Sequence, residues 1–150
     1  MGSLDGRTAL VAGASRGIGE YMAKALAAAG AKVAVAARTV EVTDKRLPGT
    51  IHSVAQSINE SGGEAIPVVM NMRDPESISV GVAEAAEKLG GLDIIINNAA
   101  ILVPGSLESV LERHIELIWQ VDLRGPLLLM KAALPHLKTA GAGDLINISS

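Results

Sequence analysis

Cysteine and phenylalanine are absent from the 150-residue sequence, and tryptophan and tyrosine occur once each. Without cysteine the chain has no disulfide framework and no thiol chemistry, which suits a cytoplasmic location. The hydrophobic core must be aliphatic, because almost no aromatic side chain is available to fill it. The three histidines, His52, His114 and His136, are scattered without the spacing of metal ligands, so we expect no metal site.

Length and charge are those of one globular domain, residues 1–150. A chain of this length can bury roughly 70% of its unfolded surface around a single core. Because 49% of the residues are hydrophobic and the formal net charge is −3, neither disorder nor nucleic-acid binding is expected. The first residues lack the basic and apolar regions of a signal peptide, and the apolar runs are too short for a membrane span.

Apolar segments rich in β-branched residues alternate with helical segments along the whole chain. Strands are predicted at residues 8–12, 32–37, 65–70, 93–97 and 144–148, and helices at 17–29, 50–60, 75–89 and 107–138. We expect an interruption of the last helix near Gly125 and Pro126. Buried strands separated by helices indicate a parallel sheet that is covered on both faces. Right-handed crossovers then predict a doubly wound α/β fold with strand order 3-2-1-4-5.

A glycine-rich turn, Gly13-x-x-x-Gly17-x-Gly19, joins the first predicted strand to the first predicted helix. In such a turn the first glycine permits a sharp exit from the strand, the second lets phosphates approach the backbone, and the third lets helix and sheet pack closely. The N–H groups at the helix N-terminus would then hold a pyrophosphate. The alternative is an ordinary glycine turn in a βα unit.

The type of dinucleotide is indicated by charge at the end of the second predicted strand. A site for NAD usually has Asp or Glu there, about 20 residues beyond the glycine turn, to hold the ribose 2′-hydroxyl. Here the sequence has Arg38 and Thr39, and Arg16 lies in the glycine turn, so we expect NADP(H) rather than NAD(H). Either arginine could instead be a solvated loop charge. Glu41 and Asp44 would weaken the preference if their loop folds back toward the site.

Three motifs, each at the carboxyl end of a predicted strand, make the sequence resemble the short-chain dehydrogenase/reductase family. They are the glycine turn, Asn97-Asn98-Ala99-Ala100 and the final Asn147-Ile148-Ser149-Ser150. The segments 36–39 and 45–51 resemble the branch of that family that contains hydroxysteroid dehydrogenase-like protein 2. The resemblance implies a Rossmann-type domain and hydride transfer between a nicotinamide and a small carbonyl or alcohol substrate.

The resemblance also implies which residues contact the cofactor. Ile18 would donate its backbone N–H to the pyrophosphate while its side chain packs, Asn71 and Met72 would hold the adenine, and Asn98 would line the ribose. An asparagine that ends a strand can also be only a turn former. The complete expected set is Gly13, Ser15, Arg16, Gly17, Ile18, Gly19, Arg38, Thr39, Asn71, Met72, Asn98, Ala99 and Ala100.

Family members use Asn, Ser, Tyr and Lys in catalysis. The serine position is filled by Ser150, with Ser149 as the alternative, and Asp122 stands where the asparagine is expected. Asp122 could equally be an ordinary residue at a helix kink. The tyrosine–lysine pair is not found, because Tyr21, which we expect to pack against its surroundings, is followed by Lys24 at the wrong spacing.

Two functions therefore compete. The chain is either the cofactor-binding part of an NADP(H)-dependent oxidoreductase, truncated after the fifth strand, or a nucleotide-binding module or scaffold without catalysis. A homo-oligomer is expected, because the helical region 107–138 resembles the family's dimerisation surface and the fifth strand would leave an apolar edge.

Overall fold

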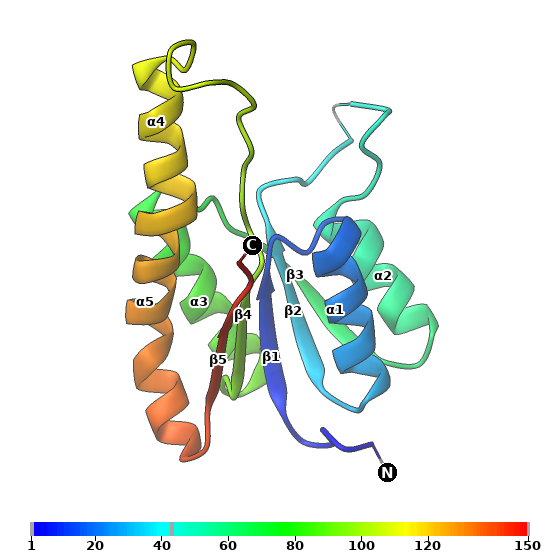
Figure 1. Ribbon diagram of the computed structural model, residues 1–150. Helices are drawn as coiled ribbons and strands as arrows, with labels where there is room; N and C mark the ends of the chain where they lie inside the picture. The colour runs from blue at the N-terminus through cyan, green and yellow to red at the C-terminus, as the bar shows by residue number, and fades with distance from the viewer. Residues whose placement is uncertain (1, 43, 150) are drawn as a thin grey trace.

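The computed structural model describes residues 2–42 and 44–149. Five parallel strands form one sheet in the order β3-β2-β1-β4-β5, as the sequence predicts (Figure 1). The strands are β1 (Thr8–Ala12), β2 (Lys32–Ala37), β3 (Glu64–Val69), β4 (Ile94–Asn97) and β5 (Asp144–Asn147). The helices are α1 (Gly17–Ala28), α2 (Ile51–Glu60), α3 (Pro75–Leu89), α4 (Glu112–Ile118), the π-helix η1 (Trp119–Arg124) and α5 (Gly125–Ala140).

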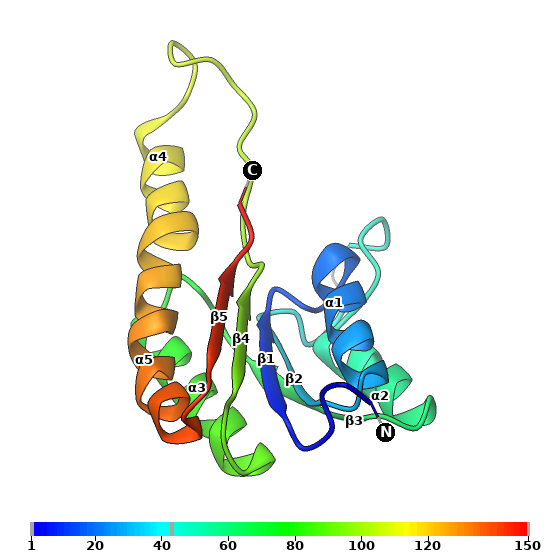
Figure 2. The same ribbon diagram turned by 60° about the horizontal axis from the view of Figure 1, so that its bottom comes forward.

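Helices cover both faces of the sheet, which explains why the central strands are apolar except at their ends. Helices α1 and α2 lie on one face, and α3 and α5 lie on the other (Figures 1 and 2). Successive side chains of a strand point to opposite faces. Accordingly, Leu10 packs in the cluster under α3 and α5, whereas Val11 packs in the cluster under α1 and α2. Both are completely buried, so neither face of β1 is open to solvent.

Two helices begin on side-chain caps that their sequences supply. The Thr50 hydroxyl accepts the N–H of Ser53 at 3.0 Å, and the Ser53 hydroxyl accepts the N–H of Thr50 at 2.9 Å, which completes a capping box for α2. At the start of α3, Asp74 accepts the N–H of Glu76 at 3.0 Å, and Pro75 occupies the first turn, where its missing N–H leaves no bond unmade. These caps fix where α2 and α3 begin.

The last helical region differs from the prediction of one helix over 107–138. Residues 106–110 form a turn instead, in which the Ser106 N–H donates to the Ser109 hydroxyl at 3.0 Å and that hydroxyl donates to the Ser106 carbonyl. Side-chain bonds of this kind compete with helix formation, so α4 begins only at Glu112. The expected interruption near Gly125 is present as the π-helix η1, which ends at Arg124, and the chain stays helical through Pro126.

A cluster of polar side chains connects β1 with β4 and β5 at the amino end of the sheet. Asp93 accepts the N–H and the hydroxyl of Thr8 at 2.7 and 2.8 Å. The Arg7 guanidinium lies 3.7 Å from Asp93 and donates to Asp144 at 3.0 Å. These contacts hold β1, β4 and β5 together at the end of the sheet opposite the carboxyl ends of the strands. Within the described residues, no helix is both long enough and apolar enough to cross a membrane.

Candidate functional site

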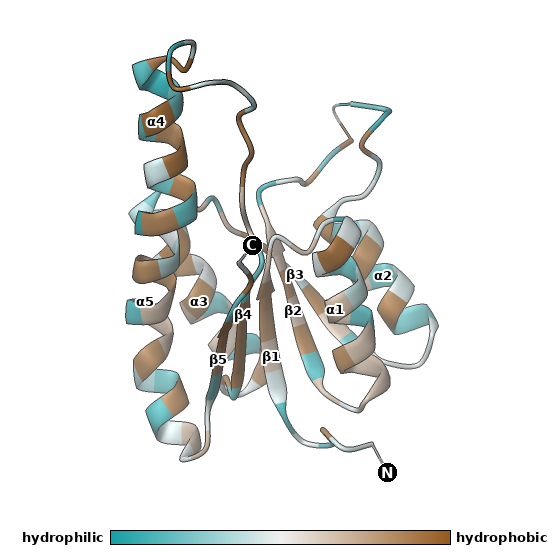
Figure 3. Ribbon diagram, in the orientation of Figure 1, coloured by the Kyte–Doolittle hydropathy of each residue, from teal (hydrophilic) through white to brown (hydrophobic). Residues whose placement is uncertain are grey.

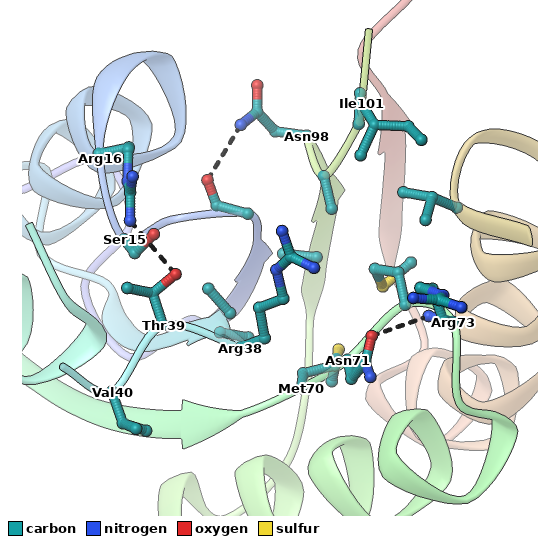
Figure 4. Close-up of a pocket in the computed structure, with 18 of the residues that line it drawn as sticks. Ser15, Arg16, Arg38, Thr39, Val40, Met70, Asn71, Arg73, Asn98 and Ile101 are labelled. Atoms are coloured by element: carbon teal, nitrogen blue, oxygen red, sulfur yellow. Dashed lines mark hydrogen bonds between the residues drawn. The ribbon is translucent and has the colours of Figure 1, made fainter. Parts of the chain in front are cut away.

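A cavity of about 710 Å³ lies at the carboxyl end of the sheet, where β1, β2, β3 and β4 give way to loops (Figure 4). Ligands of open α/β sheets bind at this edge. Most of the residues that the sequence assigns to a cofactor line it: Gly13, Ser15, Arg16, Arg38, Thr39, Asn71, Met72, Asn98, Ala99 and Ala100. Three do not, namely Gly17, Ile18 and Gly19, which form the start of α1.

The three glycines of the turn have different surroundings. A Cβ on Gly13 would lie 2.7 Å from the backbone of Ala99, and a Cβ on Gly19 would lie 2.2 Å from the Gly13 carbonyl oxygen. These positions let the turn, β4 and α1 pack in direct backbone contact. Gly17 has φ +59°, and no described atom lies within 4 Å of the place where its Cβ would be. The turn therefore leaves open space at the helix start.

Helix α1 begins without a side-chain cap among the described residues, unlike α2 and α3. The first N–H groups of a helix lack partners within it and carry a partial positive charge, so they favour an anion. Ile18 presents its side chain to solvent, with 65% of its surface exposed, so the predicted packing of that side chain is wrong. Tyr21 is 78% exposed because it lies opposite the buried positions Ala23 and Ala27, and its predicted packing is wrong too.

Asn98 joins the end of β4 to the glycine turn. Its side-chain amide donates to the Gly13 carbonyl at 3.2 Å, and its backbone N–H donates to the Ala12 carbonyl at 3.1 Å. The neighbouring Asn97 is buried, and its Oδ1 atom has no hydrogen-bond partner among the described residues. These bonds hold the floor of the cavity in place.

Two arginines line the same side of the cavity in different ways. Arg38 follows β2, is exposed, and extends its guanidinium toward the middle of the cavity (Figure 4). Arg16 instead donates to the Thr39 hydroxyl at 3.3 Å and to the Gly49 carbonyl at 3.4 Å. Gly49 has φ +109°, and a Cβ there would lie 2.4 Å from the Ser15 carbonyl oxygen. Arg16 and Gly49 therefore close the 40–49 loop onto the glycine turn.

This loop folds back toward the site and brings two carboxylates to the cavity, the case for which the sequence predicts a weaker preference for NADP(H). Glu41 and Asp44 both line it. Arg46 donates to both oxygens of Asp44, at 3.1 and 2.9 Å. These bonds hold the pKa of Asp44 below its ordinary value, and the charge of Arg16 lowers that pKa further. The negative charge of Asp44 is thus matched by an adjacent guanidinium.

The opposite wall is the turn after β3. The Asn71 side chain accepts the N–H of Arg73 at 3.1 Å, and the Asn71 N–H donates to the Ser77 hydroxyl of α3 at 2.9 Å. Sequence reasoning missed Arg73, which lines the cavity, and also missed Leu47, Ile101 and Val121. No motif marks these positions, because loops that are distant in sequence converge there.

The candidate catalytic residues lie outside the lining of the cavity or outside the described residues. Asp122 is part of η1, and its carboxylate accepts the N–H of Ile101 at 3.0 Å, so it holds the loop that follows β4. Ser149 is exposed beyond the end of β5, and Ser150 lies outside the described residues. Within the part of the chain that the structure covers, no cluster of His, Asp and Glu could hold a metal ion.

Comparisons with known proteins agree with this arrangement. The family model described as short chain dehydrogenase matches residues 7–150. Hydroxysteroid dehydrogenase-like protein 2 from Bos taurus is 42% identical over 99% of this chain. That match covers 35% of the relative, so the chain spans about a third of the length of the curated relatives it matches.

Solved structures give the same picture. A short chain dehydrogenase from Mycobacterium thermoresistibile has a TM-score of 0.92 and 38% identity, over 98% of this chain and 52% of that chain. A dehydrogenase/reductase from Sinorhizobium meliloti has a TM-score of 0.84 and 35% identity, over 99% of this chain and 55% of that chain.

Proposed function

Because the chain belongs to the short-chain dehydrogenase family, whose fold implies a nicotinamide cofactor, we propose that it binds the adenosine half of NADP(H). The chain would then be the cofactor-binding part of an oxidoreductase that acts on a carbonyl or alcohol substrate. The observation that carries the proposal is the open, uncapped start of α1 beside the exposed guanidinium of Arg38. When bound, a nicotinamide cofactor supplies or accepts the hydride.

The residues present fit such a cofactor. Gly17 leaves open space where a Cβ would lie, and the N–H groups of Gly17, Ile18 and Gly19 begin a helix that has no side-chain cap. A pyrophosphate is stabilised by unpaired N–H groups and by the helix dipole. Ser15, Ala99 and Ala100 would line the path of the dinucleotide, and Asn71 and Met72 would hold the adenine across the cavity.

The charge of the cavity favours a 2′-phosphate. The Arg38 side chain makes no hydrogen bond and no ion pair within the described part of the chain, so its charge is available to a ligand. Of the two carboxylates in the lining, Asp44 opposes it only weakly, because Arg46 already pairs with Asp44, so Glu41 is the negative charge that Arg38 must outweigh. One or two charge-assisted hydrogen bonds should make NADPH bind roughly 10–100-fold more tightly than NADH.

Titration of both cofactors into the wild-type protein and into Arg38→Ala tests this proposal. We expect the preference for NADPH in the wild type, and we expect Arg38→Ala to lose most of it while NADH affinity changes little. Arg113→Ala, an exposed substitution on α4, is the matched control and should keep the preference. Equal affinities of NADPH and NADH for the wild type would contradict the proposal.

For the chemical step we propose that Ser150, or else Ser149, hydrogen-bonds the reacting oxygen and that Asp122 supports the site by holding the loop at Ile101. The only tyrosine of the 150 residues, Tyr21, is exposed on α1, so the acid–base group would come from chain outside them. General acid–base help is worth about 10²–10⁴-fold. We therefore expect these 150 residues alone to bind cofactor without oxidising NADPH in the presence of aldehydes and ketones. A substantial rate would contradict this assignment.

A non-catalytic nucleotide-binding module is the alternative, and extending the chain separates the two. A longer protein that contains a Tyr-x-x-x-Lys pair should reduce a carbonyl compound, and Ser150→Ala should impair it far more than Ser149→Ala. Asp122→Asn should leave the rate of this protein unchanged or raise it. An extended protein that binds NADPH tightly but stays inactive toward all carbonyl compounds would favour the binding module.

We also propose that the protein forms a homo-oligomer through the outer face of α4, η1 and α5. Hydrophobic residues recur along α4, η1 and α5 (Figure 3). One series, with a spacing of four residues, has side chains that are each about half exposed. The series is Leu111, Ile115, Trp119, Leu123 and Leu127. Exposed apolar patches of this kind mark interaction surfaces. Light scattering should show an oligomer that Leu123→Glu dissociates, and a wild-type monomer at all concentrations would refute the proposal.

A further inference from the structure

The π-helix η1 touches two of the loops that line the cavity. Three of its residues at alternate positions, Gln120, Asp122 and Arg124, make these contacts. Asp122 binds the loop after β4, whereas Gln120 and Arg124 both bind Arg73 in the turn after β3. Short π-helical segments are rare and often occur at functional sites. The contacts at Arg73 are independent of the catalytic assignments above.

Arg73 is bonded to η1 through two of its groups, the backbone carbonyl and the guanidinium. The Arg124 guanidinium donates to the Arg73 carbonyl at 2.7 Å, which is a short, charge-assisted bond. The Arg73 guanidinium in turn donates through Nε to the Gln120 side chain at 3.2 Å. Next to them, a Cβ on Gly125 would lie 2.7 Å from the Met72 carbonyl oxygen, so helix and turn are in direct contact. The turn therefore cannot shift without breaking these bonds.

The residues held in this way form the wall that follows β3, next to Arg38, which follows the neighbouring strand β2. Asn71, Met72 and Arg73 all line the cavity, and the bond from the Arg73 N–H orients the Asn71 side chain. Ser77 of α3 holds the Asn71 N–H from the other side. The turn is thus fixed between two elements, and Arg124 supplies the shortest of the bonds that hold it.

We propose that Arg124 is a positioning residue for the ligand: by holding the Arg73 carbonyl, it fixes the Asn71–Arg73 wall against which the adenine lies. The inference rests on the proposed function for the identity of the ligand. This role differs from general stabilisation of the fold. It predicts faster amide exchange confined to the Asn71–Arg73 wall and weaker binding of ligands that contain adenine.

The test uses Arg124→Ala, Arg124→Lys and the matched control Arg113→Ala. The first readout is amide hydrogen exchange of residues 71–74 without ligand. The second is the dissociation constant of NADPH and of 2′,5′-ADP, which lacks the nicotinamide half. Loss of the bond should speed amide exchange at residues 71–74 and raise the dissociation constants of both ligands by a similar factor of about 2 to 30.

Arg124→Lys keeps a cation that can reach one carbonyl, so it should recover part of both effects, and it replaces Arg124→Ala if that variant fails to fold. Unchanged exchange at residues 71–74, or a dissociation constant no different from that of Arg113→Ala, would overturn the inference. If the wild type binds neither ligand, the proposed function fails, and the exchange comparison still decides whether Arg124 holds the turn.

Discussion

Replacing Gly17 with alanine should separate ligand binding from folding stability. Gly17 has φ +59°, a left-handed conformation that costs an L-residue about 1–2 kcal/mol. Its Cβ would meet no described atom within 4 Å, so the substitution adds strain but no clash. We therefore expect the free energy of unfolding to fall by about 1–2 kcal/mol and the fold to be retained.

The effect on the cofactor should be separate from this strain, because the new methyl group lies where the pyrophosphate would approach the backbone. Overpacking by one methyl group costs about 1–3 kcal/mol, which corresponds to about 5- to 150-fold weaker binding. Calorimetric titration with NADPH measures this loss, and denaturant unfolding of the ligand-free protein measures the strain.

Gly90→Ala is the matched control. Gly90 has φ +84° and also faces open space, but it lies at the end of α3, next to the amino end of β4. The two variants should lose similar stability, and only Gly17→Ala should lose affinity for NADPH. Equal dissociation constants for both variants would refute the assignment of the glycine turn to the pyrophosphate.

Three further predictions concern packing, capping and charge. Leu129→Ala should lower the free energy of unfolding by about 2–5 kcal/mol in denaturant titrations, because Leu129 is fully buried; Leu102→Ala, at a position 89% exposed, should change it by less than about 0.5 kcal/mol. Thr50→Ala should cost about 0.5–2 kcal/mol in the same assay, since it removes the cap of α2, and a variant as stable as wild type would contradict the cap. The carboxyl pKa of Asp44, measured by NMR, should lie below 3.8 and rise toward that value in Arg46→Ala. Because this pKa is lowered in the folded state, the contribution of Asp44 to stability is present at neutral pH and is lost as the pH falls through it.

The strand order could be predicted because its signals are local. Apolar strands, the glycine turn and the cap at Asp74 each specify their own segment. Right-handed crossovers, together with a glycine turn typical of dinucleotide-binding domains, then favour the order that the sheet has. The start of α4 could not be predicted in the same way, because the bonds between Ser106 and Ser109 compete with a helix that the apolar pattern favours. The π-helix depends on tertiary partners such as Ile101, which no local pattern reveals.

Site residues that directly follow a strand could be predicted from the sequence, whereas those that reach the cavity from converging loops could not. Gly13, Arg38 and Asn98 follow β1, β2 and β4, and parallel strands bring such positions to one edge. Leu47 and Arg73 reach the cavity only because the 40–49 loop folds back and η1 holds the turn after β3. Their place depends on contacts between segments far apart in sequence.

The position of β1 at the centre of the sheet also has a kinetic consequence. Its pairing with β2 joins near neighbours, such as Thr8 and Lys32, whereas the Thr8–Asp93 bonds beside β4 join residues 85 positions apart. Closing the longer loop costs about 1 kcal/mol more in chain entropy. The β1–β2–β3 half can therefore assemble early, while the opposite flank of β1 stays exposed until β4 arrives. During that interval the apolar edge of β1 is open to other chains, and folding yield should fall as protein concentration rises.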